Sequence, residues 1–260
     1  MTDLTSLNAQ QRDAVLQSVN HNVVLLAGAG SGKTHTLVKR TEYLITDLNV
    51  SPANIMLVTF TNKAASEIME RIQKISPDAN KMWIGTFHKI CVRIIRMFGK
   101  NLGITNFTIL DTKDARNIIK KILKAHGEET SADKVKFYQA GISELRNGLV
   151  GKEQALNDPN IEKKFAEIYV DYVDTCWKNK TFDFDDLIMY GMLLISTFPY
   201  VANWIHNNIK YIMVDECQDT NVAQFTLIKL LAGNNNAMLV GKVTLLTLNH
   251  INCGKDIAIL

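Results

Sequence analysis

Near its start the chain reads Val23-Val24-Leu25-Leu26-Ala27-Gly28-Ala29-Gly30-Ser31-Gly32-Lys33-Thr34. The four apolar residues predict a buried strand, and the glycines let successive backbone N–H groups turn inward without a Cβ in the way. The apolar spacing that follows predicts a helix over residues 33–45, with its N-terminus facing the same anion. We interpret residues 27–34 as a phosphate-binding loop between a strand and a helix.

Two side chains of this loop are predicted to bind phosphate and a metal ion. Lys33 would reach the β- and γ-phosphates of a nucleoside triphosphate, and the Thr34 hydroxyl would bind Mg²⁺. The alternative is a glycine-rich turn that carries a surface lysine. The strand pattern before the loop and the helix pattern after it favour the nucleotide site.

The bulk composition sets broad limits. The chain has 260 residues, 47% of them hydrophobic and 21% charged, as in a globular protein. Its net charge of +3 permits a nucleic-acid partner without arguing for one. The four cysteines show no CxxC pair, so we expect reduced thiols in the cytoplasm, no disulfides and no zinc site. No apolar run approaches about 18 residues, so we expect no membrane segment.

Short apolar strands and amphipathic helices alternate at both ends of the chain. This alternation predicts an α/β fold, with a parallel sheet covered by helices on both faces. The predicted strands are 23–26, 55–59, 83–85, 211–214 and 238–240, and the predicted helices include 64–75 and 87–98. Between these parts, residues 99–199 are dominated by helical periodicity. We interpret them as an inserted, mostly helical subdomain with a surface loop over 148–159.

A second candidate site follows the apolar run Ile212-Met213-Val214. Asp215 comes at the carboxyl end of this strand and could hold Mg²⁺, and Glu216 could act as general base toward water. In open α/β sheets ligands bind at the edge where the strands have their carboxyl ends, which is also where the phosphate loop lies. Adjacent acids alone are more often a solvated turn. After a buried strand the catalytic interpretation is the better one.

Six motifs in serial order carry a resemblance to superfamily 1 DNA helicases of the UvrD/Rep/PcrA type. The motifs are 7–15 (Q motif), 27–34 (motif I), 58–65 (motif Ia), 85–88 (motif Ib), Asp183-Phe184-Asp185-Asp186-Leu187 and 214–221 (motif II). The resemblance implies a RecA-like ATP-binding domain over 1–98 and 200–241. It also implies the inserted subdomain over 99–199.

The resemblance implies an enzyme that couples ATP hydrolysis to 3′-to-5′ movement on single-stranded DNA or at a duplex junction. ATP would bind Ala27, Gly28, Ala29, Gly30, Ser31, Gly32, Lys33 and Thr34, with Gln11 reading adenine. Gln218 would sense the γ-phosphate. Single-stranded DNA would contact Phe60, Thr61, Asn62, Thr86 and His88, where Phe60 offers a ring for base stacking and the others offer neutral donors. Repair and replication restart both stay open as pathways.

The sequence departs from the family pattern in three places. Cys217 stands where an aromatic residue is usual, and His35 stands where an arginine is common. After Gly241 no motif III follows, so we interpret residues 242–260 as an aberrant tail left by a frameshift, a truncation or a gene remnant. The family's second RecA-like domain, which supplies an arginine finger, would be the missing intramolecular partner.

Three functions are therefore compared. The first is the ATP- and DNA-binding part of a helicase, which alone unwinds nothing and hydrolyses ATP close to background. The second is a non-catalytic ATP- or DNA-binding remnant. A small-molecule kinase is disfavoured, because such kinases lack the acidic run 215–221 and the segment 59–62.

Overall fold

The computed structural model describes residues 2–17, 22–28, 30–242 and 257–259. By its contacts the chain divides into two compact units. The sheet unit comprises Met1–Ile90, Phe198–Thr220 and Ile228–Leu260. The helical unit comprises Cys91–Thr197 and Asn221–Leu227.

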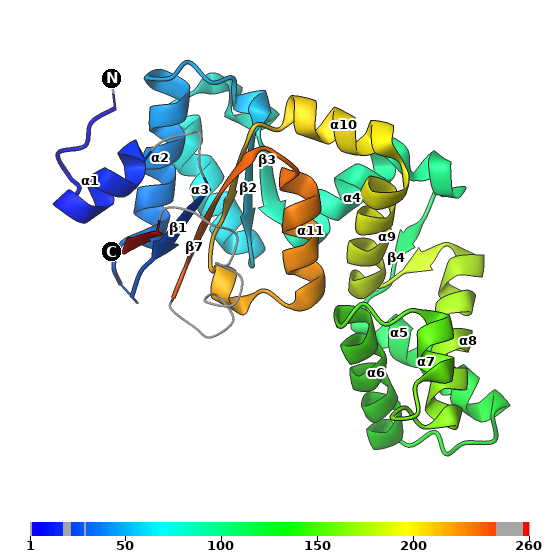
Figure 1. Ribbon diagram of the computed structural model, residues 1–260. Coiled ribbons are helices and arrows are strands. Elements are labelled where there is room, and N and C mark those ends of the chain that lie inside the picture. Colours follow the sequence, from blue (N-terminus) through cyan, green and yellow to red (C-terminus); the bar gives the residue numbers. More distant parts are fainter. Residues whose placement is uncertain (1, 18–21, 29, 243–256, 260) are drawn as a thin grey trace. The chain divides into compact units, whose positions relative to one another are not determined.

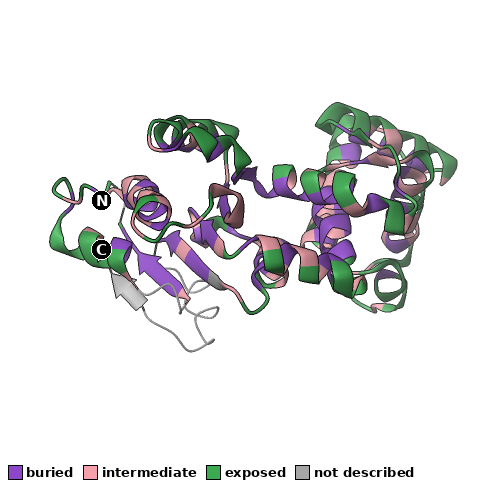
Figure 2. Cartoon of the chain, turned by 90° about the horizontal axis from the view of Figure 1, so that it is seen from above, coloured by how far each residue is buried: buried purple, intermediate pink, exposed green. Residues whose placement is uncertain are grey.

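The sheet unit is built on a parallel sheet in the order β3-β2-β6-β7-β1-β8. Its strands are β1 (Val23–Leu26), β2 (Ile55–Thr59), β3 (Trp83–Thr86), β6 (Tyr211–Val214), β7 (Asn236–Gly241) and β8 (Ile257–Ile259). The described residues of β1, β2, β3, β6 and β7 are buried almost throughout (Figure 2). Such burial on both faces explains why the strands read as continuous apolar runs.

Helices cover both faces of this sheet. The helices of the unit are α1 (Ala9–Leu16), α2 (Lys33–Thr46), α3 (Asn62–Gln73) and α10 (Pro199–Asn208), with short 3₁₀ turns at Pro52–Asn54, Pro77–Lys81 and Cys217–Asp219. On one face α2 and α3 pack against alternate strand residues such as Leu25 and Leu57 (Figure 1). On the other face Trp204 of α10 lies 6.2 Å from Trp83, measured between ring centroids. The predicted fold class is confirmed.

The helical unit has its own apolar core. Its helices are α5 (Thr112–Ala125), α6 (Ala132–Asn147), α7 (Lys152–Asn157), α8 (Lys163–Asn179) and α9 (Phe184–Thr197). Strands β4 (Thr108–Ile109) and β5 (Thr181–Phe182) form a short parallel pair, and a 3₁₀ turn spans Gly99–Leu102. Two helices belong to both units, since α4 (Phe87–Phe98) and α11 (Val222–Ala232) each cross a boundary.

Two local expectations need correction. The predicted loop over 148–159 contains α7, which buries Ala155 against the core of the helical unit. No element was expected in residues 242–260, yet β8 pairs in parallel with β1. Most of the expected aberrant tail, residues 243–256 and 260, lies outside the described residues.

Among the described residues no single helix is both long and apolar enough to span a membrane. One bent pair of helices, Phe184–Thr197 with Pro199–Asn208, meets that test on length and composition only.

Candidate active site

The glycine-rich loop joins the end of β1 to the start of α2. Gly30 and Gly32 have φ angles of 76° and 81°, a left-handed conformation that glycine adopts without steric cost. A Cβ added to Gly28 or Gly30 would meet no atom within 4 Å. The loop is therefore uncrowded on the side to which a Cβ at Gly28 or Gly30 would point. Ala29 lies outside the described residues.

Gln11, a residue of α1, forms a hydrogen bond with the glycine-rich loop. Its Nε2 donates to the carbonyl oxygen of Ser31 at 2.8 Å, and a Cβ on Gly32 would lie only 2.7 Å from that nitrogen. Its Oε1 accepts from the backbone N–H of Asn8 in a capping box. Each end of this amide keeps one further hydrogen-bonding position, because Nε2 carries two N–H groups and Oε1 two lone pairs. Adenine recognition by Gln11 stays a prediction.

The loop lysine meets the second acidic residue of the predicted pair. Lys33 Nζ lies 2.9 Å from Glu216 Oε2, although 183 residues separate the two in sequence. The Thr34 hydroxyl donates to Asp215 Oδ2 at 3.4 Å. These contacts form because the parallel strands β1 and β6 have their carboxyl ends at one edge of the sheet. The structure brings all four residues together.

The two acids differ in their electrostatic surroundings. Burial raises the pKa of Asp215, and the neighbouring Glu216 charge raises it further. Partial burial also acts to raise the pKa of Glu216, but hydrogen bonds from Gln218 and Lys33 outweigh it and lower that pKa. Glu216 is therefore held as a carboxylate, the form that can accept a proton.

Glu216 has a backbone conformation that the sequence did not reveal. Its φ of 52° is left-handed, which costs a residue with a Cβ about 1–2 kcal/mol. Strained residues of this kind cluster at functional sites, where surrounding contacts hold them. Here the side chain is held between Lys33 and Gln218.

Gln218 links Glu216 to the end of β7. Its Nε2 donates to Glu216 Oε2 at 2.7 Å, and its Oε1 accepts from the backbone N–H of Lys242 at 2.8 Å. A Cβ on Gly241 would lie 2.5 Å from that Oε1, so the glycine permits the approach. The sequence did not predict that Gly241 and Lys242 contact Gln218. The one local signal for this contact was a glycine directly after a predicted strand.

Thr34 and Asp215 suit Mg²⁺ chemically. Both offer oxygen atoms, and Mg²⁺ is commonly held by one or two protein oxygens together with phosphate oxygens and water. Among the described residues no group of three or more His, Cys, Asp and Glu gathers in the manner of an all-protein metal site. The residues present therefore fit a metal ion that arrives with a phosphate ligand.

The predicted DNA-contacting residues lie at the carboxyl ends of β2 and β3, which pair in register through Thr59 and Thr86. Phe60 is half-buried, with its ring 5.6 Å from that of Phe87. Asn62 is exposed and His88 is half-buried.

The threonine hydroxyls of this edge already have partners. Thr61 caps α3 by accepting from the N–H of Ala64, and Thr86 accepts from the N–H of Lys89 at 3.3 Å. A hydroxyl can accept one hydrogen bond and donate another at the same time. These acceptor contacts therefore leave each threonine O–H able to donate to a phosphate.

The element at residues 183–187 stabilises the helical unit. Asp183 and Asp186 form reciprocal hydrogen bonds with each other's backbone N–H at the start of α9. Asp186 also forms a buried ion pair with Arg146 of α6, and the Tyr172 hydroxyl donates to Asp183 Oδ2 at 2.6 Å. Sequence reasoning assigned this motif only by resemblance. Its Asp-x-x-Asp spacing is the capping signal that could have shown its local role.

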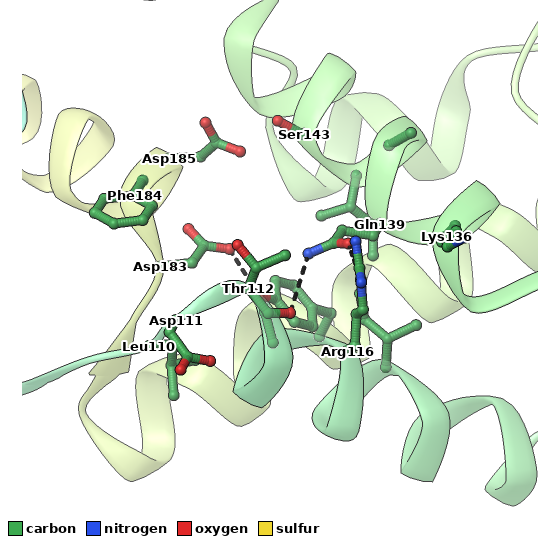
Figure 3. Close-up of a pocket in the computed structure, with 15 residues that line it drawn as sticks. Leu110, Asp111, Thr112, Arg116, Lys136, Gln139, Ser143, Asp183, Phe184 and Asp185 are labelled. Atoms are coloured by element: carbon green, nitrogen blue, oxygen red, sulfur yellow. Dashed lines mark hydrogen bonds between the residues drawn. The ribbon is translucent and has the colours of Figure 1, made fainter. Parts of the chain in front are cut away.

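A cavity of about 510 Å³ lies beside this element, between the start of α5, the middle of α6 and the turn into α9 (Figure 3). Asp183 and Asp185 lie on one side of it and Arg116 and Gln139 on the other (Figure 3). Arg116 Nε donates to Gln139 Oε1 at 2.8 Å, so these two side chains are hydrogen-bonded to each other.

Comparison with known sequences decides the family. A model of the UvrD/REP helicase N-terminal domain matches residues 7–243. The chain belongs to the UvrD/REP helicase family. Two relatives in this family are named ATP-dependent DNA helicase PcrA. The chain is 40% identical to the one from Staphylococcus aureus (strain Mu50) over 243 residues, and 39% identical to the one from Staphylococcus epidermidis (strain ATCC 35984) over 241 residues.

These alignments cover 92% and 91% of this chain but 33% of each relative. The chain thus spans about a third of the length of the UvrD/REP relatives that it matches. The matched residues 7–243 include the glycine-rich loop and the acids Asp215 and Glu216.

The raised pKa of Asp215 predicts a pH-dependent effect on stability. At neutral pH the folded chain bears the cost of a buried carboxylate that the unfolded chain does not bear. Asp215→Asn removes that cost, so we expect a higher unfolding midpoint at pH 7. The gain should shrink as the pH falls through the folded-state pKa, where Asp215 becomes neutral. Thermal unfolding between about pH 4 and pH 7 measures this.

Asp13→Asn, at an exposed acid of α1, is the matched control and should leave the midpoint unchanged. A loss of stability in Asp215→Asn that is equal at every pH would contradict the electrostatic account.

Proposed function

We propose that this chain is the ATP- and single-stranded-DNA-binding part of a 3′-to-5′ DNA helicase. The observation that carries the proposal is the convergence of Lys33 and Thr34 with Glu216 and Asp215 at one sheet edge. The names of the PcrA relatives support the activity, and the motif series supports the direction of movement. Unwinding itself is assigned to the longer protein, because strand separation requires two such domains that close and open.

In the proposed ATP complex Lys33 exchanges partners. In the structure its ammonium group pairs with Glu216 at 2.9 Å. The β- and γ-phosphates carry more negative charge than one carboxylate, so they would draw Lys33 away from Glu216. Glu216 would then face the γ-phosphate as a free carboxylate, still hydrogen-bonded by Gln218 and able to take a proton from water.

Mg²⁺, held by Thr34 and Asp215 together with the phosphates, would supply charge neutralisation for the departing γ-phosphoryl group. Gly30 and Gly32 contribute the open, left-handed loop, and the N-terminus of α2 contributes its dipole.

The DNA-binding part of the proposal rests on the neighbouring edge of the same sheet. Phe60 would stack on a base, and its ring is held by an edge contact with the ring of Phe87. Asn62 and His88 would contact the sugar–phosphate backbone without reading sequence. Because β2 pairs directly with β6, the residues after β2 lie next to the strand that ends in Asp215 and Glu216.

ATP binding is tested by Lys33→Ala. Charge-assisted hydrogen bonds contribute about 1.5–3 kcal/mol, so we expect the affinity for ATP with Mg²⁺ to fall by about ten- to a hundredfold. Lys39→Ala is the matched control, because Lys39 lies on the same helix and pairs with Glu42 instead. Titration with a fluorescent ATP analogue measures both. Unchanged affinity in Lys33→Ala would remove the assignment of the loop.

DNA binding is tested by Phe60→Ala. Stacking of one base on an aromatic ring contributes about 1–3 kcal/mol, so we expect about a five- to hundredfold loss of affinity for a labelled oligothymidylate. Phe137→Ala, at an aromatic residue of the helical unit that is 65% exposed, is the control. Fluorescence anisotropy gives both affinities. If the two variants bind equally well, Phe60 is not a stacking residue.

A further inference from the structure

Consecutive hydrogen bonds link the backbone of the short segment that follows Glu216. The N–H of Asp219 donates to the carbonyl oxygen of Glu216 at 3.0 Å. Thr220 donates to the carbonyl oxygen of Cys217 both through its N–H, at 3.3 Å, and through its buried hydroxyl, at 2.6 Å. The segment therefore has little freedom to absorb a displacement of Glu216.

The segment continues into a helix cap. Asn221 Oδ1 accepts from the N–H of Gln224 at 2.8 Å, and Gln224 Oε1 accepts from the N–H of Asn221 at 3.3 Å. This capping box fixes the Asn221 side chain at the start of α11. The peptide bond between Thr220 and Asn221 is also where the chain passes from the sheet unit into the helical unit.

Within the helical unit, the fixed side chain of Asn221 reaches α6. Its Nδ2 donates to Asn147 Oδ1 at 2.7 Å, and Asn147 Nδ2 donates to Ser143 Oγ at 3.2 Å. Asn147 is the last residue of α6, directly after Arg146, the partner of Asp186. Asp185 and Ser143 lie at the same end of the cavity in Figure 3.

We propose that Asn147 is a positioning residue that couples nucleotide binding at Glu216 to the helical unit through Asn221. The proposal rests on the proposed ATP function. When Lys33 leaves Glu216, the segment 216–221 settles into a second arrangement, and the contact between Asn221 and Asn147 carries that change to the end of α6. Nothing in the local sequence around Asn147 marks it for this role, since its partner lies 74 positions away.

Hydrogen exchange on the full chain, with and without Mg²⁺ and a non-hydrolysable ATP analogue, tests the coupling. In the unsubstituted chain we expect the analogue to slow exchange by about threefold or more both in α2 and in residues 141–147 and 183–187. In Asn147→Ala we expect slowing in α2 alone. Alanine is a good helix former, so the end of α6 should persist in this variant.

Coupling between two sites is reciprocal, so Asn147→Ala should also weaken binding of the analogue by about two- to tenfold. Asn117→Ala, at an exposed asparagine of α5 in the same unit, is the matched control and should behave like the unsubstituted chain in both measurements.

The outcomes separate this proposal from the proposed function. Slowing in α2 but none in 141–147 of the unsubstituted chain overturns the coupling and leaves ATP binding intact. If the analogue slows hydrogen exchange in residues 141–147 as much in Asn147→Ala as in the unsubstituted chain, the coupling is also overturned. No slowing in α2 overturns the proposed ATP site, and the coupling with it.

Discussion

The ion pair between Lys33 and Glu216 depends on the order of strands in the parallel sheet. β7 pairs with both β1 and β6, so the carboxyl ends of the two site-bearing strands are held at one edge with one strand between them. A buried ammonium group without an anion would be costly, and Glu216 supplies that anion. The left-handed backbone of Glu216 and its hydrogen bond from Gln218 both serve to hold the carboxylate at this point.

The helical unit depends on a different buried pair. Arg146 and Asp186 are both almost fully buried, and removing either partner would leave a charge in an apolar core. Asp186 is fixed in turn by its reciprocal bonds with Asp183 at the start of α9. Asn147 follows Arg146 directly at the end of α6, and its side chain accepts a hydrogen bond from Asn221 at the start of α11.

Much of the sheet unit could be predicted from sequence, because strands buried on both faces leave continuous apolar runs. β1, β2 and β6 begin and end where the pattern placed them, and α4 spans the predicted residues 87–98. Features that depend on contacts between distant positions left no local signal. These include the left-handed Glu216, the bond from Lys242 to Gln218 and the pairing of β8 with β1. α7 was missed because a single buried residue, Ala155, is too short a pattern to detect.

The central claim is that Lys33 is shared between Glu216 and the phosphates of ATP. A double-mutant cycle on nucleotide affinity, with Glu216→Gln, Lys33→Ala and the combined variant, tests it most directly. The account predicts that Glu216→Gln strengthens ATP binding by about two- to fivefold when Lys33 is present, because it removes a partly exposed competing partner. In the Lys33→Ala background that gain should largely vanish. Weaker binding in Glu216→Gln, or the same change in both backgrounds, would contradict the account.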